Sequence, residues 1–403
     1  MSDVNDAPIR YIGLDIHKHY LVAIGVNQAQ ERVYGPKKVQ LAELEKWIVK
    51  DLRANDAVVL EMTTNTWEMV DRLQPHVGSV TVVHPPDVHL IVKARVMTDR
   101  KAALALAQLH AAHLLPAVWI PPQEVRELRA LVAQRRKFVR LRTTAKNRLH
   151  ALLHRRHIIP PKVKGGIFHS RMRPWWRELP LSPAEQMQVQ SDLDTLIFAD
   201  KQIQRFDRRL ARRAAEDDRA ALLAQLPGMG IVNTMTVLGA IGEIERFPSP
   251  VKLVGYAGLG AKVHDSGQKR TTGKITKMGR RDLRTAMVEA ARHAVKHHPY
   301  WREQFQRLEA RIGRHKAVVA IARKMLIAVW HILMTQSVDR HGDAEQIAAA
   351  FFAHAYRIGV ANLPQGLSAR QYVRYMLDRL HIGQEVTRIR WGRKWVTIPP
   401  SPS

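Results

Sequence analysis

The chain has 403 residues, of which 46% are hydrophobic and 25% are charged, and its formal net charge is +28. This composition is typical of a globular protein with two or three domains. The basic excess indicates a polyanionic partner, and nucleic acid fits it better than an acidic membrane surface. Because the chain contains no cysteine, disulfides, cysteine-ligated zinc and thiol nucleophiles are excluded. Any nucleophile must therefore be an oxygen or a nitrogen.

No apolar run approaches the ~18 residues that a membrane span requires. Residues 1–9 lack both the basic start and the apolar core of a signal peptide. We therefore expect a cytoplasmic protein with no membrane partner.

Residues 10–120 alternate the patterns of strands and helices, which predicts a mixed α/β domain. The strands are expected at 10–26, 56–62 and 79–86, the last ended by two prolines, and the helices at 41–52, 66–73 and 100–115. The segment PAVWIPP, residues 116–122, breaks the pattern and is typical of a linker.

Two long helical patterns follow, at 124–157 and 183–215, and they predict an antiparallel coiled coil within a region that spans 121–215. The first pattern is strongly basic. Between 126 and 156 it has eleven Lys or Arg residues and a single acid, Glu127. A solvated helix normally mixes both signs, so this bias favours a face that contacts nucleic acid. The expected contacts are Arg135, Arg136, Lys137, Arg140, Lys146 and Arg148.

Between these helices, Trp175 and Trp176 stand among arginines. Such a pair can stack on bases, but it more often anchors a loop against a helix. Both interpretations remain open at this point.

The region 216–335 is expected to be mostly helical. Its segment LPGMG, 226–230, resembles the turn of a helix-hairpin-helix, which presents backbone N–H groups to a phosphate. The segment 253–261 indicates a glycine-spaced strand or turn, and 265–279 a polar loop. Helices are expected over 280–295 and 314–335, and residues 336–403 indicate a helical extension with a basic tail, RIRWGRKW.

Three acids stand at the ends of these elements. Asp15 lies within the first apolar strand, Glu61 closes the second strand, and Asp99 begins the helix after the third. Carboxylates that meet in this way form a site for Mg²⁺, which prefers hard oxygen ligands. This is the pattern expected of a ribonuclease H-like fold. Each acid could instead pair with a basic residue, and Asp99 could cap its helix.

The segments YIGLDIHK, VVLEMT and TDRKAALALAQL resemble the N-terminal domain of the DEDD insertion-sequence transposases. The block from LPGMG through LVGYAGLGAKVHDSG to GKITKMGRRDLRTAMVEAA is similar to the C-terminal domain of that family. The resemblance covers roughly residues 10–335. It implies a RuvC-like domain over 10–120, a coiled-coil region over 121–215 and a serine transposase domain over 216–335.

One position departs from the family pattern. The family motif T-D-x-x-D-A carries a fourth acid three residues after the third, and here Ala102 stands at that place. Residues at this spacing share a helix face, so the substitution removes one expected metal ligand. We expect Ala102→Asp to strengthen Mg²⁺ binding and strand cleavage.

The resemblance further implies that Ser266 of the D-S-G segment is the nucleophile that attacks a DNA phosphate and forms a phosphoserine link. Cations around it would neutralise the phosphate during the reaction. From the residues alone, Ser266 could merely form a turn, and Tyr256 is a rival nucleophile. The cations expected to contact nucleic acid here are Lys269, Arg270, Lys274, Lys277, Arg281 and Arg284.

Taken with the resemblance, these patterns predict a transposase and site-specific recombinase that cleaves and rejoins DNA strands with Mg²⁺. Its implied partners are donor and target double-stranded DNA, a bridging guide RNA and further copies of the chain, arranged as a dimer of dimers. When bound to DNA it would associate with the nucleoid. Three alternatives remain: a RuvC-like nuclease that uses water, a non-catalytic nucleic-acid-binding protein, and a sugar-kinase-type ATPase.

Overall fold

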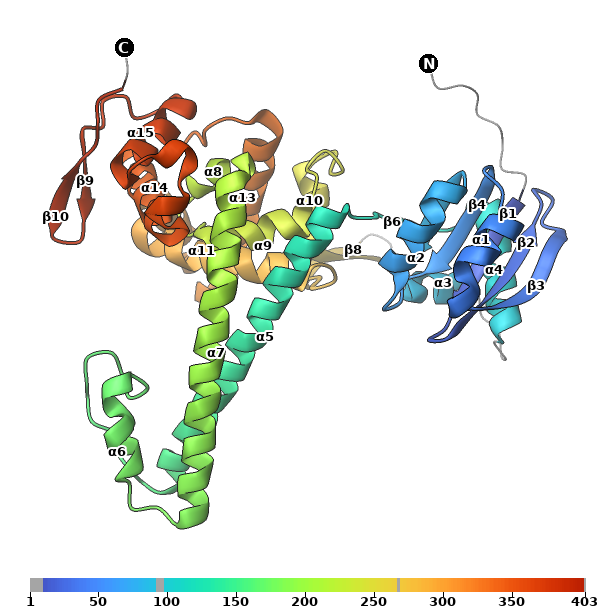
Figure 1. The fold of residues 1–403 in the computed structure, drawn as a ribbon. Coiled ribbons are helices and arrows are strands. Elements are labelled where there is room, and N and C mark those ends of the chain that lie inside the picture. Colours follow the sequence, from blue (N-terminus) through green and yellow to red (C-terminus); the bar gives the residue numbers. More distant parts are fainter. Residues whose placement is uncertain (1–9, 92–97, 267–268, 402–403) are drawn as a thin grey trace. The chain divides into compact units, whose positions relative to one another are not determined.

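The computed structural model describes residues 10–91, 98–266 and 269–401, and for residues 263–266 and 269–273 it describes the backbone alone. The chain divides into two compact units, Met1–Pro121 and Pro122–Ser403 (Figure 1). The expected boundary between 120 and 121 lies one residue from this division. The finer division of the second unit into three domains stays a prediction.

The N-terminal unit is built on a six-stranded sheet with the order β3-β2-β1-β4-β5-β6. Its three middle strands, β1, β4 and β5, are parallel, and β2, β3 and β6 run antiparallel to their neighbours. The strands are β1 Arg10–Ile16, β2 Tyr20–Val26, β3 Arg32–Gln40, β4 Asp56–Glu61, β5 Ser79–Val83 and β6 Ala117–Val118. Sequence reasoning missed β3, and it assigned β6 to a linker.

Helices cover both faces of this sheet. On one face α1 and α2 pack through Trp47, Ile48 and Val70 onto the apolar side of β1 and β4. On the other face α4 lies against β1 and β2, where Gly13 permits a close approach: a Cβ there would stand 2.1 Å from the carbonyl oxygen of Ala103. The helices are α1 Leu44–Asp51, α2 Thr66–Leu73, α3 Pro85–Ile91 and α4 Asp99–Ala111.

The C-terminal unit begins with two long helices, α5 Gln123–Arg155 and α7 Pro183–Glu216, which confirm the predicted pair. They lie side by side along most of their length (Figure 1). Ion pairs join them, and as the α5 residue number rises its partner's number on α7 falls, which shows an antiparallel arrangement. The pairs are Arg135–Asp207 at 2.5 Å, Arg142–Asp200 at 3.1 Å and Arg148–Asp192 at 3.5 Å, and Arg156, the residue after α5, continues the series with Glu185 at 2.7 Å.

The tryptophan pair between these helices is an anchor. Trp176, on α6 Arg173–Arg177, is 1% exposed and donates its indole N–H to the carbonyl of Ile167. Trp175 packs edge-on against it, with 5.0 Å between the ring centroids. Base stacking by Trp176 is therefore excluded, because the ring is already enclosed by the protein.

The remaining helices share one apolar core that extends from Leu128 to Ile398. Helix α13 has the length and composition of a membrane span, against our expectation that no segment would, but its apolar side packs on α10, α11 and α12. That burial explains its hydrophobicity. The helices are α8 Asp218–Ala224, α9 Ile231–Ile241, α10 Pro250–Tyr256, α11 Arg281–His297, α12 Pro299–Ile312, α13 Arg314–Thr335, α14 Ala344–Ile358 and α15 Ala369–Arg379.

Two segments differ from the sequence expectation. The glycine-spaced segment 253–261 lies mostly in helix α10 and the turn after it. The expected loop 265–279 belongs largely to an antiparallel hairpin of β7 Ala261–Ser266 and β8 Lys269–Ile275. A second hairpin near the C-terminus pairs β9 Arg388–Trp391 with β10 Lys394–Thr397.

Candidate metal centre and nucleic-acid surface

Two of the three predicted acids meet around a histidine. The Nε2 atom of His17 lies 3.3 Å from Asp15 Oδ2 and 3.4 Å from Asp99 Oδ2. One ligand atom from each of the three residues falls within 4.8 Å of the others. The site thus joins the end of β1, the turn after it and the first residue of α4.

Glu61 stands beside Asp15 on the neighbouring strand. Strands β1 and β4 are parallel, with Leu14 opposite Leu60, so Asp15 and Glu61 are the next residues along each strand. Side chains at matching positions of adjacent strands lie on the same face of a sheet. The negative charge of Asp15 contributes to raising the pKa of Glu61, as expected for two acids at one sheet edge.

The acids differ in their electrostatics. Burial raises the pKa of the Asp15 carboxyl, and His17 opposes that rise while Asp99 adds to it. Burial also raises the pKa of Glu61. By contrast, a hydrogen bond from the Tyr20 hydroxyl, 2.9 Å from Oδ2, lowers the pKa of Asp99. Asp99 therefore holds its negative charge most readily, and the two strand acids gain most from a nearby cation.

Local structure fixes Asp99 in place. Thr98 caps α4 by accepting a hydrogen bond from the Lys101 N–H at 3.4 Å, so capping by Asp99 is not its role. The close contact of α4 with Gly13 sets this helix against β1. Ala102 lies one turn further along α4, at the position where the family pattern has its fourth acid.

The residues present fit a divalent cation. The His17 Nε2 atom is buried, and within the described chain it has no hydrogen-bond partner, because it is not aligned for a hydrogen bond with either nearby carboxylate. Ligand atoms on adjacent vertices of an octahedral Mg²⁺ at ~2.1 Å lie about 3 Å apart, close to the separations seen here. The mixed oxygen and nitrogen set also suits transition ions such as Mn²⁺.

Sequence reasoning missed His17 and Tyr20. Both belong to the same motif as Asp15, in the segment DIHKHY at 15–20. The signal available was the two-residue spacing of Asp15 and His17, although their meeting depends on the turn after β1. Tyr20 starts β2, and only the antiparallel pairing of β1 with β2 brings its hydroxyl toward α4.

The predicted nucleophile lies in the other unit. Ser266 ends β7, and its backbone pairs with Lys269. The side chains of 263–273, and with them those of Ser266, Lys269 and Arg270, lie outside the described residues. The rival Tyr256 is packed, with its ring centroid 5.2 Å from that of Phe247 and the guanidinium of Arg246 over its ring. Its role as nucleophile is correspondingly disfavoured.

The basic residues expected to contact nucleic acid divide into two groups. Several already hold partners within the chain: Arg135 and Arg148 pair with acids of α7, Arg136 lies 3.7 Å from Asp282, and Arg284 donates to the Ala257 carbonyl. Lys146 lies against the ring of Phe168. The remaining members with described side chains are exposed, namely Lys137, Arg140, Lys274, Lys277 and Arg281.

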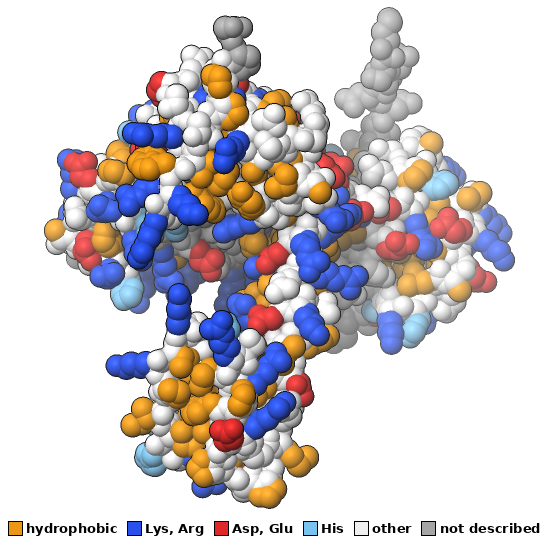
Figure 2. Space-filling view, turned by 60° about the vertical axis from the view of Figure 1, so that its left-hand side comes forward, with side chains coloured by type: hydrophobic (Ala, Val, Ile, Leu, Met, Phe, Trp, Pro, Cys, Tyr) orange, Lys and Arg blue, Asp and Glu red, His pale blue; other side chains and the backbone are white. Residues whose placement is uncertain are grey.

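The basic bias of α5 therefore has a partly structural explanation. Its arginines face acids that α7 contributes, a balance that the composition of α5 alone conceals. Figure 2 shows blue Lys and Arg side chains spread over the visible face of this unit, with red acids among them. The exposed cations, rather than the whole helix, form the candidate nucleic-acid surface.

Comparisons with known proteins show the family of the chain. The sequence profile of the DEDD transposases of the IS110 type matches residues 12–158, and that of the transposase IS116/IS110/IS902 family matches residues 220–306. The first segment holds Asp15, His17, Glu61 and Asp99. The second holds Ser266.

Curated relatives match along most of their length. The transposase for insertion sequence element IS1111A of Coxiella burnetii is 26% identical over 83% of this chain and 92% of its own length. The pilin gene-inverting protein of Moraxella bovis is 25% identical over 80% and 95%. A probable family 20 transposase of Pseudomonas aeruginosa is 23% identical over 82% and 98%. With both family profiles matched in order, the chain belongs to the DEDD transposases of the IS116/IS110/IS902 family and is a DNA transposase.

Proposed function

We propose that this transposase is an RNA-guided, site-specific recombinase that cleaves and rejoins DNA through a phosphoserine link, assisted by Mg²⁺. The observation that carries the proposal is the cluster of Asp15, His17 and Asp99, with Glu61 on the adjacent strand. In the relatives, the name pilin gene-inverting protein describes a DNA rearrangement, which supports recombination over simple hydrolysis.

The N-terminal unit is, in this proposal, a RuvC-like domain of the ribonuclease H-like fold. Its support is the strand order, in which β3, β2 and β1 pair antiparallel and β1, β4 and β5 pair parallel. In open sheets, functional sites form at the carboxyl ends of parallel strands. Asp15 and Glu61 stand at those ends.

The acids and His17 would hold the cation. When bound, Mg²⁺ polarises a phosphoryl oxygen and neutralises charge that develops in phosphoryl transfer. Asp99 supplies a carboxylate that the Tyr20 hydroxyl keeps ionised and oriented. Asp15 and Glu61 are half-buried acids, and burial raises the pKa of each. A proton therefore competes with the cation for each carboxylate.

Ser266 would carry the covalent step. Its hydroxyl oxygen forms a bond to the DNA phosphorus, and the bond from phosphorus to the leaving deoxyribose oxygen breaks. The serine proton passes to a base or to water, and the leaving oxygen takes up a proton from water, so that it departs as a hydroxyl. Attack by the freed hydroxyl of another strand on the phosphoserine then rejoins DNA and regenerates serine. Exposed Lys274, Lys277 and Arg281 nearby in sequence would neutralise the phosphates.

The partners follow from this chemistry. Strand exchange requires donor and target duplexes, so several copies of the chain must act together, and we propose a tetramer arranged as a dimer of dimers. Base pairing with a guide RNA would choose the sequence, while basic side chains contact backbones. Since its substrate is DNA, the protein would act in the cytoplasm, associated with the nucleoid when bound.

The test uses the purified full-length chain, the RNA that co-purifies with it, and DNA that carries the ends of its insertion sequence. We expect joined recombinant DNA that disappears after RNase treatment, after chelation of divalent cations, and in the Asp15→Asn variant. Asp71→Asn, at an exposed acid on α2, serves as the matched control and should keep activity. Recombination that survives RNase would contradict RNA guidance.

A RuvC-like nuclease that uses water is the second candidate, because the acid cluster by itself would serve it equally well. The two differ in the fate of the phosphate. A nuclease leaves free DNA ends and no protein bound to DNA in denaturing gels. Free ends without any adduct would assign the chain to hydrolysis.

A further inference from the structure

The C-terminal hairpin is the basic segment RIRWGRKW, whose purpose the sequence left open. Strands β9 and β10 pair with Trp391 opposite Lys394, so that Gly392 and Arg393 form the turn. Gly392 has a φ of 62°, which glycine adopts readily. The hairpin lies beyond residue 306, where the matched family profiles end.

One side of the hairpin fixes it to the helical core. Ile389 is fully buried, and Trp391 packs edge-on against Phe352 with 5.1 Å between ring centroids. Trp391 also stacks near Tyr356, on the same helix α14, at 6.4 Å. The hairpin is thus held against the helical core, and the side chains on its opposite side are exposed.

That opposite side combines an exposed aromatic ring with two cations. Side chains alternate along a strand, so Arg388 and Arg390 point away from the buried Ile389, and Trp395 stands opposite Arg390. Trp395 is 56% exposed, and the guanidinium of Arg388 lies over its ring, 4.7 Å from the centroid. We call Arg388, Arg390 and Trp395 the Trp395 face.

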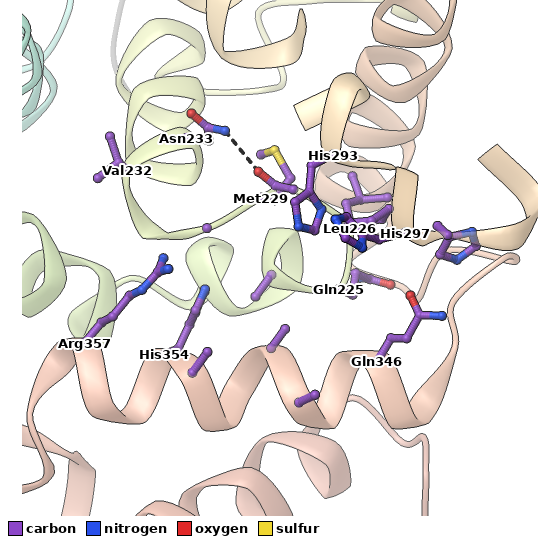
Figure 3. Close-up of a pocket in the computed structure, with 18 of the residues that line it drawn as sticks. Gln225, Leu226, Met229, Val232, Asn233, His293, His297, Gln346, His354 and Arg357 are labelled. Carbon is purple, nitrogen blue, oxygen red and sulfur yellow. Dashed lines mark hydrogen bonds between the residues drawn. The ribbon is translucent and has the colours of Figure 1, made fainter. Parts of the chain in front are cut away.

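A cavity of about 1130 Å³ adjoins this face, because Arg390 also lines it. Its walls come from α9, α11 and α14 and from the LPGMG segment 226–230 (Figure 3). Arg357 reaches the start of α9: its Nη1 atom would be 3.0 Å from a Cβ placed on Gly230. A guanidinium beside the N-terminus of a helix favours an anion such as a phosphate.

His354 adds a neutral polar group to the cavity wall. It is 7% exposed and lines the cavity from α14. Burial, together with Arg357, lowers its pKa to about 4, so the ring is uncharged at neutral pH. Such a ring can exchange hydrogen bonds with a base or a sugar hydroxyl.

We propose that the Trp395 face and the adjoining cavity bind unpaired nucleotides of RNA. A base stacks on Trp395, Arg388 and Arg390 contact the phosphates on either side, and the strand continues toward Arg357 and His354 in the cavity. Aromatic rings interleaved with cations are suited to single strands, because duplexes hide the faces of their bases. This inference rests on the RNA partner proposed above.

RNA is chosen over single-stranded DNA for a physical reason. Duplex DNA exposes base faces only after its strands separate, whereas a folded RNA presents loops and bulges continuously. A surface that binds such loops would bind the guide RNA whether or not the target DNA is bound. It would also explain why the basic tail carries tryptophans in addition to arginines.

The experiment measures binding of a fluorescent oligouridylate to the full-length, RNA-free protein by fluorescence anisotropy. Loss of base stacking in Trp395→Ala should weaken binding about tenfold, whereas Trp395→Phe should keep most of the affinity. Arg390→Ala should reduce the salt dependence of the affinity by about 0.7 of a counterion. Lys50→Ala, exposed on α1, changes the net charge equally and is the matched control.

The outcomes separate this inference from the proposed function. If the wild-type chain binds no RNA, the RNA partner itself is wrong. If it binds RNA but Trp395→Ala and Arg390→Ala behave like Lys50→Ala, only the Trp395 face is wrong. If the variants lose as much affinity for duplex DNA as for oligouridylate, the assignment to unpaired strands is wrong. If the wild-type chain binds oligothymidylate as tightly as oligouridylate, the assignment to RNA is wrong. Unchanged thermal unfolding of the variants excludes misfolding.

Discussion

The Nε2 atom of His17 lies 3.3 Å from Asp15 Oδ2 and 3.4 Å from Asp99 Oδ2. His17, two residues after Asp15, thus lies between two acids that are far apart in the sequence of the N-terminal unit. A nitrogen placed between carboxylates in this way can serve as a third metal ligand. If a metal binds here, this nitrogen would occupy a ligand position beside the one that Ala102 leaves without an oxygen.

Replacing His17 tests that role. His17→Ala should weaken binding of Mn²⁺ by about tenfold or more, since even outer-shell partners of metal ligands contribute that much. Mg²⁺, which prefers oxygen, should lose less. Isothermal titration with each ion gives the comparison, and His19→Ala, at an exposed neighbour, is the control. Equal affinities in the His17→Ala and His19→Ala chains would remove His17 from the site.

Restoring the fourth acid should strengthen the site. Ala102 lies three residues after Asp99 on α4, so the carboxylate of Ala102→Asp would project from the same face of the helix. We expect tighter Mg²⁺ binding and DNA cleavage at lower Mg²⁺ concentration. Identical Mg²⁺ dependence in both proteins would reject this account of the family motif. Gln108→Glu, on another face of α4, controls for the added charge.

The two groups of basic residues on α5 should behave differently. Arg140 is exposed, and within the described residues it has no acidic partner, whereas Arg142 pairs with Asp200 at 3.1 Å. Arg140→Ala should lower DNA affinity and reduce the slope of log K against log salt by about 0.9. Arg142→Ala should instead cost less than about 1 kcal/mol of stability and leave the slope unchanged. If the salt slopes of the wild-type, Arg140→Ala and Arg142→Ala proteins are equal, Arg140 does not contact DNA.

The stability of the C-terminal unit should depend on pH through His354. Its pKa is lowered to about 4 in the folded chain, against ~6.5 when unfolded. The unfolded state therefore takes up the proton first, and the free energy of unfolding falls as pH drops from about 6.5 to 4, by about 3 kcal/mol in total. In denaturant unfolding, His354→Gln should remove most of this decrease. The smaller contributions of His293 and His298, whose pKa values burial also lowers, should persist.

The N-terminal unit provides an internal control for that experiment. His110 also has a pKa lowered to about 4, mainly by burial, and its contribution should persist in the His354→Gln chain. A C-terminal transition whose pH dependence is the same in both proteins would show that another group dominates.

Sequence patterns predicted the helices and strands in which apolar residues recur at a regular spacing. Helices α5, α7 and α13 and strands β1, β4 and β5 agree with their expected ranges within a few residues. Strand β3 was missed because its side chains are mostly exposed, so apolar alternation is weak on this outer strand. The β7–β8 hairpin was missed because glycine and polar residues conceal pairing that depends on the partner strand.

Sites were harder to predict than elements, for a related reason. The acids Asp15, Glu61 and Asp99 could be found because strand ends are visible in sequence. His17 enters only through the turn that follows β1, and Tyr20 through its pairing with that strand. The apparent one-sided charge of α5 likewise depends on α7, whose acids lie about 30 to 70 residues away along the chain. Local patterns do not contain such distant partners.

The covalent link is the central claim, and mapping it is the most direct test. The protein is incubated with Mg²⁺ and DNA carrying the insertion-sequence ends, denatured, digested with protease and nuclease, and analysed by mass spectrometry. We predict a nucleotide attached to the peptide that contains Ser266, absent in Ser266→Ala and present in Tyr256→Phe. A nucleotide on any other residue, or its persistence in Ser266→Ala, would contradict the account.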